Sequence, residues 1–323
     1  LYPMLFEPNL RTKLWGSNRL TTWKNLPQQD HIGESWEVSA VPGSKSVVKN
    51  GPLAGRDLAD ITAEYGELLL GKAVAAKCGD QFPILIKFID AAKDLSIQVH
   101  PDDALAKARH NCFGKTEMWY VVAAEPGAAL YVGFKNNNIT REEYIAAIAE
   151  DRLPELLNKI EVKAGDTFFI PAGTVHALGK GIEVVEIQQT SNITYRLHDW
   201  NRVDSEGNSR ELHTALAIDA IDFSKSGDEC HIKYELKKND AVKLIDCPYF
   251  TINAIGVDGE LERDIVAHDS FVLYNCTEGE VDVVMNDCVE HLTQSDVVLI
   301  PAEADSVTIK GHGSLMETYI DIK

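Results

Sequence analysis

Basic residues are scarce in this chain. Its 323 residues include 31 Lys and Arg against 50 Asp and Glu, which gives a formal net charge of −19. Nucleic acids and anionic membrane surfaces are bound by clustered Lys and Arg, so we expect neither as a partner. A small anionic substrate is not excluded, because a few cations gathered at one site can oppose the overall charge.

Long apolar runs and paired cysteines are missing as well. No run approaches the roughly 20 residues of a membrane-spanning helix, and the first residues, Leu1-Tyr2-Pro3-Met4, lack the basic and apolar blocks of a signal peptide. The 6 cysteines are scattered without a Cys-x-x-Cys motif, which is typical of reduced thiols and disfavours a zinc site built from cysteine. We therefore expect a cytoplasmic protein.

Most of the chain instead has the pattern of short β-strands. Hydrophobic residues make up 45% of the sequence, enough for a sizeable core. Densely apolar or alternating runs, each bounded by turn residues, occupy 82–89, 95–100, 118–122, 129–134 and 182–188. Many short strands separated by turns indicate a sandwich or barrel, and the sequence therefore predicts a mainly β fold.

Short helical insertions interrupt this pattern near 57–77 and 140–158. The first has apolar residues at helical spacing up to Leu70, before a glycine. The second opens with Thr140 and Glu143, which are spaced as a capping box. A shorter helix is expected between residues 102 and 110.

A weak internal repeat indicates two similar β-units. Residues 165–176 align with 295–306 through a shared Asp, a β-run and Ile-Pro-Ala, but the first copy ends on His176 and the second on Ser306. The polar stretch 204–243 is interpreted as a long connection. We therefore expect a larger domain over 1–235, which contains the helical insertions and would be the metal-binding catalytic domain if His176 is a ligand, and a smaller degenerate β-domain over 236–323.

Four residues form the strongest candidate site: Gln98, His100, Glu117 and His176. Residues two apart in a strand face the same way, so Gln98 and His100 share a face. Two imidazoles and two oxygen donors suit Zn²⁺ with an open position, and they would also suit Mn²⁺ or Fe²⁺. The alternative is a set of buried polar residues that satisfy one another by hydrogen bonds.

The spacing Gly165-(five residues)-Pro171-(four residues)-His176 also matches the second half of the cupin motif. The first half is altered, since its His-x-His is replaced by Gln98-Val99-His100 and the gap to Glu117 is long. Cupins are jelly rolls. The resemblance therefore implies two cupin-like jelly-roll β-units with short helical insertions.

Polar residues near these ligands suggest an anion site. Lys115 lies two residues before the glutamate of the set, Arg196 follows the run 182–188, and Ser96 precedes the glutamine by two. Lys, Arg and Ser can all donate to phosphate oxygens. Lys87 and Lys93 are interpreted as ordinary surface cations.

Two aromatic blocks, Trp15-Gly16 and residues 33–37, allow two interpretations. Trp residues beside carboxylates recur at sugar sites, but they also form the edges of cores. The sequence leaves both interpretations open.

Six separated blocks together resemble type I phosphomannose isomerase, in its short bacterial branch. They run in the same order as in that family, over the N-terminal two thirds of the chain, and they are Leu14-Trp15-Gly16, Gly33-Glu34-Ser35-Trp36-Glu37-Val38-Ser39, Ser96-Ile97-Gln98-Val99-His100-Pro101-Asp102, Lys115-Thr116-Glu117-Met118-Trp119, Pro171-Ala172-Gly173-Thr174-Val175-His176 and Ser191-Asn192-Ile193-Thr194-Tyr195-Arg196. The large helical insertion domain of longer members is absent.

The resemblance implies a zinc-dependent interconversion of mannose 6-phosphate and fructose 6-phosphate. One Zn²⁺ per chain would be bound by the four residues of the candidate site. Arg196 matches the family's active-site arginine, while Ser96 and Lys115 match residues near the substrate and its phosphate. We expect a phosphosugar substrate and a monomer or weak homo-oligomer.

The implied chemistry moves a proton between C2 and C1 through an enediol. Arg196 would stabilise the enediolate, and Lys115 would hold phosphate or assist proton transfer. The base stays open among a zinc-bound water or hydroxide and the carboxylates and histidines of the site. Alternative functions are another metal-dependent cupin enzyme, such as an oxygenase or a different sugar-phosphate isomerase, and a non-catalytic sugar-binding bicupin.

Overall fold

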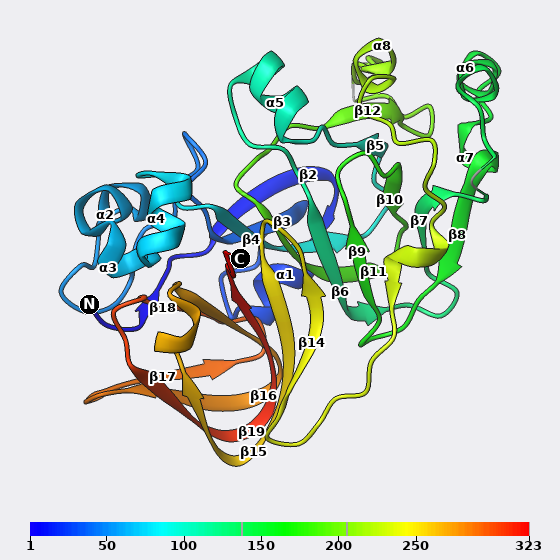
Figure 1. Cartoon of the computed structure of the whole chain (residues 1–323). Helices are drawn as coiled ribbons and strands as arrows, with labels where there is room; N and C mark the ends of the chain where they lie inside the picture. Colours follow the sequence, from blue (N-terminus) through cyan, green and yellow to red (C-terminus); the bar gives the residue numbers. More distant parts are fainter. Residues whose placement is uncertain (137, 205, 323) are drawn as a thin grey trace. The chain divides into compact units, whose positions relative to one another are not determined.

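The computed structural model describes residues 1–136, 138–204 and 206–322. These residues form a mainly β protein with three sheets and short helices, as the sequence predicts (Figure 1). Each of the six cysteines is free of a disulfide bond. Among the helices of the described residues, none has both the length and the apolar content needed to span a bilayer.

The chain folds into two compact units, and each unit is discontinuous in sequence. Unit 1 comprises Leu1–Asn9, Trp36–Ile86 and Tyr234–Lys323; unit 2 comprises Leu10–Ser35 and Lys87–Lys233. The predicted domains, 1–235 and 236–323, are each one continuous segment and stay a prediction. The difference arises because two N-terminal segments pair with C-terminal ones, through backbone hydrogen bonds that link Leu5 to residue 298, Leu69 to Ala302 and Leu70 to Phe271.

Unit 1 is built on one seven-stranded sheet. Its path is β1 (Met4–Leu5), β18 (Val297–Ile300), β16 (Val272–Met285), β19 (Ser306–Tyr319), β15 (Thr251–Asp264) and β14 (Ala241–Asp246), with β17 (Cys288–Thr293) paired to β16. Its helical elements are α2 (Leu58–Tyr65), α3 (Glu67–Leu70), α4 (Lys72–Cys78) and the 3₁₀ helix η2 (Val266–His268). The first predicted helical insertion is thus confirmed, and Asp57 caps α2 by accepting from the backbone N–H of Asp60.

Unit 2 contains a five-stranded sheet and most of a seven-stranded one. The small sheet has the order β12 (Tyr195–His198), β5 (Ile97–Val99), β10 (His176–Leu178), β7 (Ala129–Phe134) and β8 (Leu157–Glu161). The large sheet has the order β13 (His231–Ile232), β9 (Thr167–Ile170), β6 (Glu117–Ala124), β11 (Ile182–Gln189), β4 (Ile84–Ala91), β3 (Ile32–Val38) and β2 (Asn9–Ser17). The chain passes between the units within β2, β3 and β4, and again between β13 and β14.

The two sheets of unit 2 pack face to face. One apolar cluster joins β6 and β9 of the large sheet to β7 and β10 of the small one, through residues such as Trp119, Phe168 and Leu130. The other face of the small sheet is covered by short helices and turns, among them α6 (Arg141–Ala149), α7 (Leu153–Leu156) and α8 (Thr214–Ala217). The remaining helical elements are α1 (Arg19–Trp23), α5 (Asp103–His110) and η1 (Asp228–Cys230). The capping box predicted at Thr140 and Glu143 opens α6.

The internal repeat is confirmed in local structure. Asp166 and Asp296 each accept a hydrogen bond from the backbone N–H three residues earlier, at 2.9 and 2.8 Å, and a four-residue strand follows each. The preceding residues, Gly165 and Ser295, both have positive φ, at 90° and 84°. Ser295 adopts a conformation that costs a residue with Cβ some energy, so the turn itself is retained in the copy that lacks His176.

The block Trp15-Gly16 and its partner Gly33 have a structural role. A Cβ atom on Gly16 would lie 2.3 Å from the backbone nitrogen of Gly33, and one on Gly33 would lie 2.6 Å from the ring of Trp15. Both distances are far below van der Waals contact, so the close approach of β2 and β3 requires glycine at both positions.

Candidate functional site

The strand register of the small sheet brings three predicted residues side by side. Gln98 in β5 lies opposite His176 in β10 and opposite Arg196 in β12. Directly opposed residues of antiparallel strands project from the same face. His100 follows Gln98 by two residues, and Glu117 begins β6 of the facing large sheet. The predicted residues therefore converge from both sheets.

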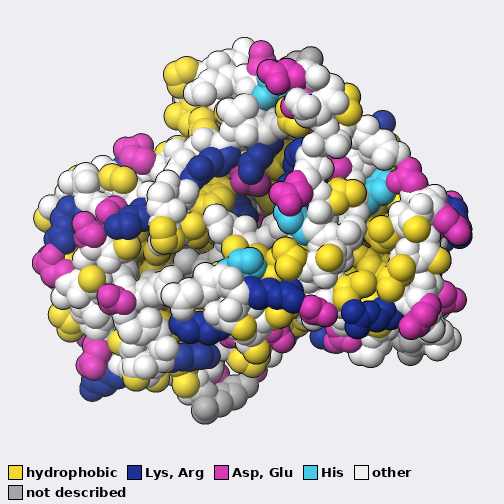
Figure 2. All heavy atoms as spheres, turned by 90° about the horizontal axis from the view of Figure 1, so that it is seen from above, with side chains coloured by type: hydrophobic (Ala, Val, Ile, Leu, Met, Phe, Trp, Pro, Cys, Tyr) yellow, Lys and Arg dark blue, Asp and Glu magenta, His cyan; other side chains and the backbone are white. Residues whose placement is uncertain are grey.

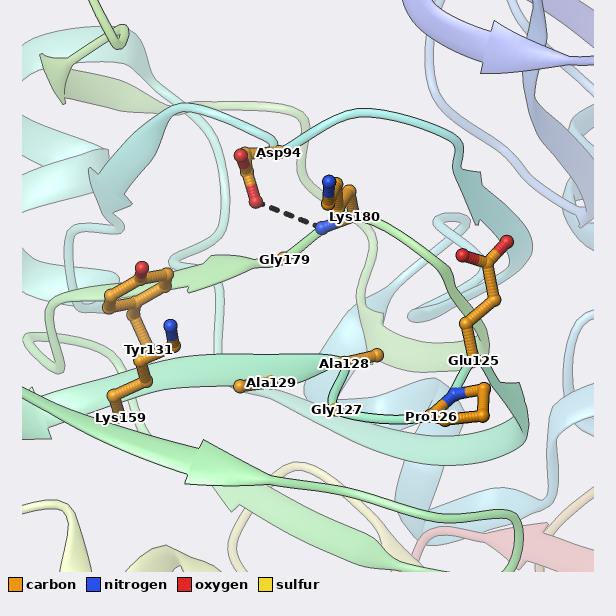
Figure 3. Close-up of a pocket in the computed structure, with 10 residues that line it drawn as sticks. All are labelled: Asp94, Glu125, Pro126, Gly127, Ala128, Ala129, Tyr131, Lys159, Gly179 and Lys180. Carbon is orange, nitrogen blue, oxygen red and sulfur yellow. Dashed lines mark hydrogen bonds between the residues drawn. The ribbon is translucent and has the colours of Figure 1, made fainter.

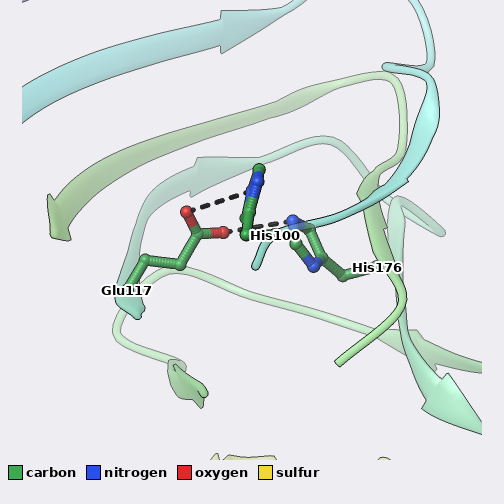
Figure 4. A group of neighbouring side chains, drawn as sticks. All are labelled: His100, Glu117 and His176. Atoms are coloured by element: carbon green, nitrogen blue, oxygen red, sulfur yellow. Dashed lines mark ion pairs between the residues drawn. The ribbon is translucent and has the colours of Figure 1, made fainter. Parts of the chain in front are cut away.

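His100, Glu117 and His176 form a compact group at the centre of this region. One ligand atom of each lies within 4.8 Å of the others, and all three side chains are buried. The Glu117 carboxylate faces both imidazoles, with its oxygens 3.5 Å from Nε2 of His100 and 3.2 Å from Nε2 of His176 (Figure 4). Glu117 Oε1 has no hydrogen-bond partner among the described residues.

The orientation of both imidazoles fits metal binding. Nδ1 of His100 lies 2.9 Å from the carbonyl oxygen of Ile193, and Nδ1 of His176 lies 2.8 Å from that of Thr174. A carbonyl only accepts, so each Nδ1 carries the proton and each Nε2 presents its lone pair to the group. Burial, followed by the charge of Lys115, lowers the pKa of His100 well below its ordinary value. His100 is therefore neutral, as a metal ligand must be.

Gln98 and Lys115 contact this group directly. The Gln98 amide lies 3.3 Å from Nε2 of His176, close enough for a half-turn of the amide to present its oxygen to the same centre. The buried Lys115 ammonium donates to Glu117 Oε2 and lies 3.0 Å from Nε2 of His100. The side chains of Lys115 and Glu117 therefore project to the same side.

Two buried charges extend the site, and the sequence interpretation missed both. Lys87 was expected at the surface, which is wrong: its side chain is buried and its Nζ lies 2.8 Å from Glu186 Oε1. Glu186 also accepts from Trp119 Nε1 at 2.9 Å and lies 3.5 Å from the Lys115 ammonium. Burial alone would raise the pKa of Glu186, but the charges of Lys115 and Lys87 hold it well below its ordinary value. The sequence signal for both residues was a charge within a largely apolar run, 82–89 for Lys87 and 182–188 for Glu186.

Arg196 and Ser96 lie around the group rather than in it. Within the part of the chain that the structure describes, neither makes a hydrogen bond to His100, Glu117 or His176. Arg196 donates from Nη1 to the carbonyl oxygen of Glu211 at 2.7 Å, while its buried Nε has no partner among the described residues. Burial, together with the nearby Arg210, lowers the pKa of Arg196. Ser96 is buried immediately before β5.

Another pocket of unit 2, of about 210 Å³, lies beyond the end of β10 that is opposite His176. Figure 3 shows its lining, which includes Asp94, Tyr131, Lys159 and Lys180. It contains none of the predicted site residues, so it is distinct from the candidate metal centre. On the surface face drawn in Figure 2, Lys and Arg side chains are interspersed with Asp and Glu.

Comparison with known proteins finds two family matches. Residues 4–126 match the family described as phosphomannose isomerase type I, catalytic domain, and residues 240–320 match the mannose-6-phosphate isomerase cupin domain. Over 98% of its length the chain is 33% identical to mannose-6-phosphate isomerase ManA of Bacillus subtilis, covering 99% of that protein. It is 35% identical to the mannose-6-phosphate isomerase of Streptococcus mutans, with 98% of both chains covered.

Solved structures show the same similarity. The crystal structure of mannose 6-phosphate isomerase from Bacillus subtilis superposes with a TM-score of 0.86 at 31% identity, covering 99% of this chain and all of the other. A putative mannosephosphate isomerase from Archaeoglobus fulgidus superposes with a TM-score of 0.80 at 25% identity, covering 100% of this chain and 99% of the other.

Proposed function

Because the chain belongs to the type I phosphomannose isomerase family, we propose that it interconverts mannose 6-phosphate and fructose 6-phosphate through an enediol, with one Zn²⁺ ion at the candidate metal centre. The comparisons confirm three things that the sequence resemblance implied: the family, its isomerase activity and the cupin-like β fold. The observation that supports the metal and the mechanism is the buried group of His100, Glu117 and His176, with the buried lysines Lys115 and Lys87 nearby.

The donor set fits a catalytic zinc ion. Two imidazole nitrogens and one carboxylate oxygen are a usual zinc ligand set, in which a further position stays open. His100, Glu117 and His176 would hold the metal, and the amide oxygen of Gln98 would complete the set. When bound, the metal would act as a Lewis acid toward a substrate oxygen.

Lys115 would contact the substrate once a metal is bound. Its ammonium now shares the Nε2 lone pair of His100, at 3.0 Å. A metal would use that lone pair, so the ammonium would keep only its carboxylate partners, Glu117 and Glu186. It would then have a donor free for a substrate oxygen or the phosphate, and Ser96 could add a hydroxyl donor.

Arg196 is proposed to act on the charge that develops during isomerisation. A proton leaves C2 of the open-chain aldose, the electron pair of that bond forms the C1–C2 double bond, and negative charge moves onto O1. Protonation of O1 gives the enediol; a proton added at C1 and one lost from O2 then give the ketose. The unpartnered Nε of Arg196 can donate to the developing oxyanion, a contact that lowers the barrier because it strengthens in the transition state.

The charges of the site favour an anionic substrate despite the net charge of −19. Two buried lysines, Lys87 and Lys115, balance the two buried carboxylates of Glu117 and Glu186. Arg196 and a divalent metal would therefore leave the site positive. A local positive site of this kind suits the phosphate of a phosphosugar.

The test is a coupled assay of mannose 6-phosphate conversion, combined with elemental analysis of the metal. We expect chelation to abolish conversion, zinc to restore it, and His176→Ala to lose both metal and activity. The control His291→Ala changes an exposed imidazole of unit 1 and should lose neither. A His176→Ala variant that keeps stoichiometric metal would refute the ligand assignment, and conversion that survives complete metal removal would refute the mechanism. Substrate binding with no conversion in the metal-loaded protein would instead favour the sugar-binding bicupin.

A further inference from the structure

His213 makes two hydrogen bonds to the backbone of Arg196, although 17 positions separate them. The His213 backbone N–H donates to the Arg196 carbonyl oxygen at 2.7 Å, and the Arg196 backbone N–H donates to Nδ1 of His213 at 3.0 Å. The second bond requires Nδ1 to be an acceptor, so the ring proton resides on Nε2. Both polar backbone groups of Arg196 are therefore satisfied by one residue.

This arrangement completes one edge of the small sheet. Strand β12 is the last strand of the small sheet, and its other side pairs with β5, where Arg196 lies opposite Gln98. An edge strand has backbone groups without a neighbour. Here the Nδ1 atom of His213 takes the place of the carbonyl oxygen that a neighbouring strand would offer.

The segment 211–213, which contains His213, also binds the Arg196 guanidinium. The carbonyl oxygen of Glu211, two residues before His213, accepts from Nη1 of Arg196 at 2.7 Å. The loop that precedes it is closed by the buried carboxylate of Asp199, which accepts from both Arg202 and Arg210. The backbone and one arm of the guanidinium are thus fixed from one segment, while Nε has no partner among the described residues.

We propose that His213 is a positioning residue for the isomerisation, acting through Arg196. It keeps β12 and the Glu211 carbonyl in place, so that the guanidinium meets the developing oxyanion without first reorienting. Preorganised donors are effective because they need no rearrangement during reaction. The inference rests on the role proposed above for Arg196.

A matched set of variants tests the acceptor atom. In His213→Asn the side-chain oxygen replaces Nδ1, whereas in His213→Gln it replaces Nε2 and is misplaced. We expect His213→Gln and His213→Ala to lower kcat about tenfold, as the loss of one aligned hydrogen bond would. KM and metal content should stay within twofold, and His213→Asn should recover most of kcat. If His213→Ala does not fold, the Asn and Gln pair decides alone.

A second comparison shows whether His213 acts through Arg196. In the Arg196→Ala background we expect His213→Gln to cause no further loss of kcat. Full kcat in His213→Gln, equal losses in the Asn and Gln variants, or a tenfold additional loss without Arg196 would each overturn the proposal. Near-normal turnover in Arg196→Ala alone would instead overturn the role assigned to Arg196, so the two failures are distinguishable.

Discussion

Replacing Glu183 by Gln should stabilise the protein, and the gain should depend on pH. Glu183 lies in β11 with its carboxylate buried, and Oε2 has no hydrogen-bond partner among the described residues. Burial and the neighbouring carboxylate of Asp90 raise its pKa to about 7, although the Arg19 guanidinium lies 3.1 Å away. The ionised side chain is therefore in an unfavourable environment at neutral pH.

The sign and size of the effect follow from proton linkage. The folded-state pKa is raised from 4.5 to about 7, so the folded protein binds this proton more tightly than the unfolded chain. Stability consequently falls as the pH rises from about 4.5 to about 7 and stays lower above that. At about 1.4 kcal/mol per pKa unit, the penalty above pH 7 is at most about 3.5 kcal/mol.

Gln removes this penalty but also weakens the contact with Arg19, which keeps its partner Asp90 at 3.2 Å. We therefore expect the free energy of unfolding to rise by about 1–2 kcal/mol at pH 8 and by less than about 0.5 kcal/mol at pH 5. Urea denaturation at both pH values measures it. Glu125→Gln is the control, because that carboxylate also faces Arg19 but is largely exposed. A gain that is equal at the two pH values, or a loss at pH 8, would refute the reasoning.

Two further substitutions test the site and the fold. Arg196→Ala should lower kcat at least 100-fold, the order expected for an oxyanion donor, with a much smaller change in KM. The control Arg152→Ala changes an exposed side chain and should leave both constants unchanged. Steady-state kinetics in which Arg196→Ala raises KM but leaves kcat nearly unchanged would contradict the role of Arg196. Gly71→Ala should lower the free energy of unfolding by more than about 2 kcal/mol, because φ is +90° and the new Cβ would lie 2.0 Å from the carbonyl oxygen of Asp269. Gly43→Ala, at φ +77° with open space around it, should cost less in the same denaturation experiment.

Local elements of the fold were predictable because their signals are local. The capping box at Thr140 acts over three residues, and the turn shared by residues 165 and 295 lies within a short repeat. The division into units was not, because it depends on which distant segments pair. Nothing in residues 68–70 shows that their backbone will bond to residues 271, 302 and 303.

The candidate metal group was predictable for a similar reason. Gln98 and His100 alternate along one strand, and His176 ends a motif whose Pro and Gly fix the strand's position. Lys87 and Glu186 were missed because each is a single charge within a run that is otherwise apolar, and their ion pair joins strands 99 residues apart. His213 was missed because its contacts are to backbone atoms, which leave no pattern of side chains.

Two buried glutamates differ in how completely their oxygens are bonded. In unit 1, the buried Glu317 accepts from Arg263, Tyr274 and Asn253, so that both of its oxygens are bonded. In unit 2, the buried Glu117 leaves Oε1 without a donor, and Arg196 leaves Nε without an acceptor, among the residues described. A buried polar atom without a partner costs about 1–3 kcal/mol. A cation bound at Glu117 Oε1 and an anionic oxygen bound at Arg196 Nε would offset these two costs, which supports the site proposed in unit 2. Glu317, with both oxygens bonded, has a structural role.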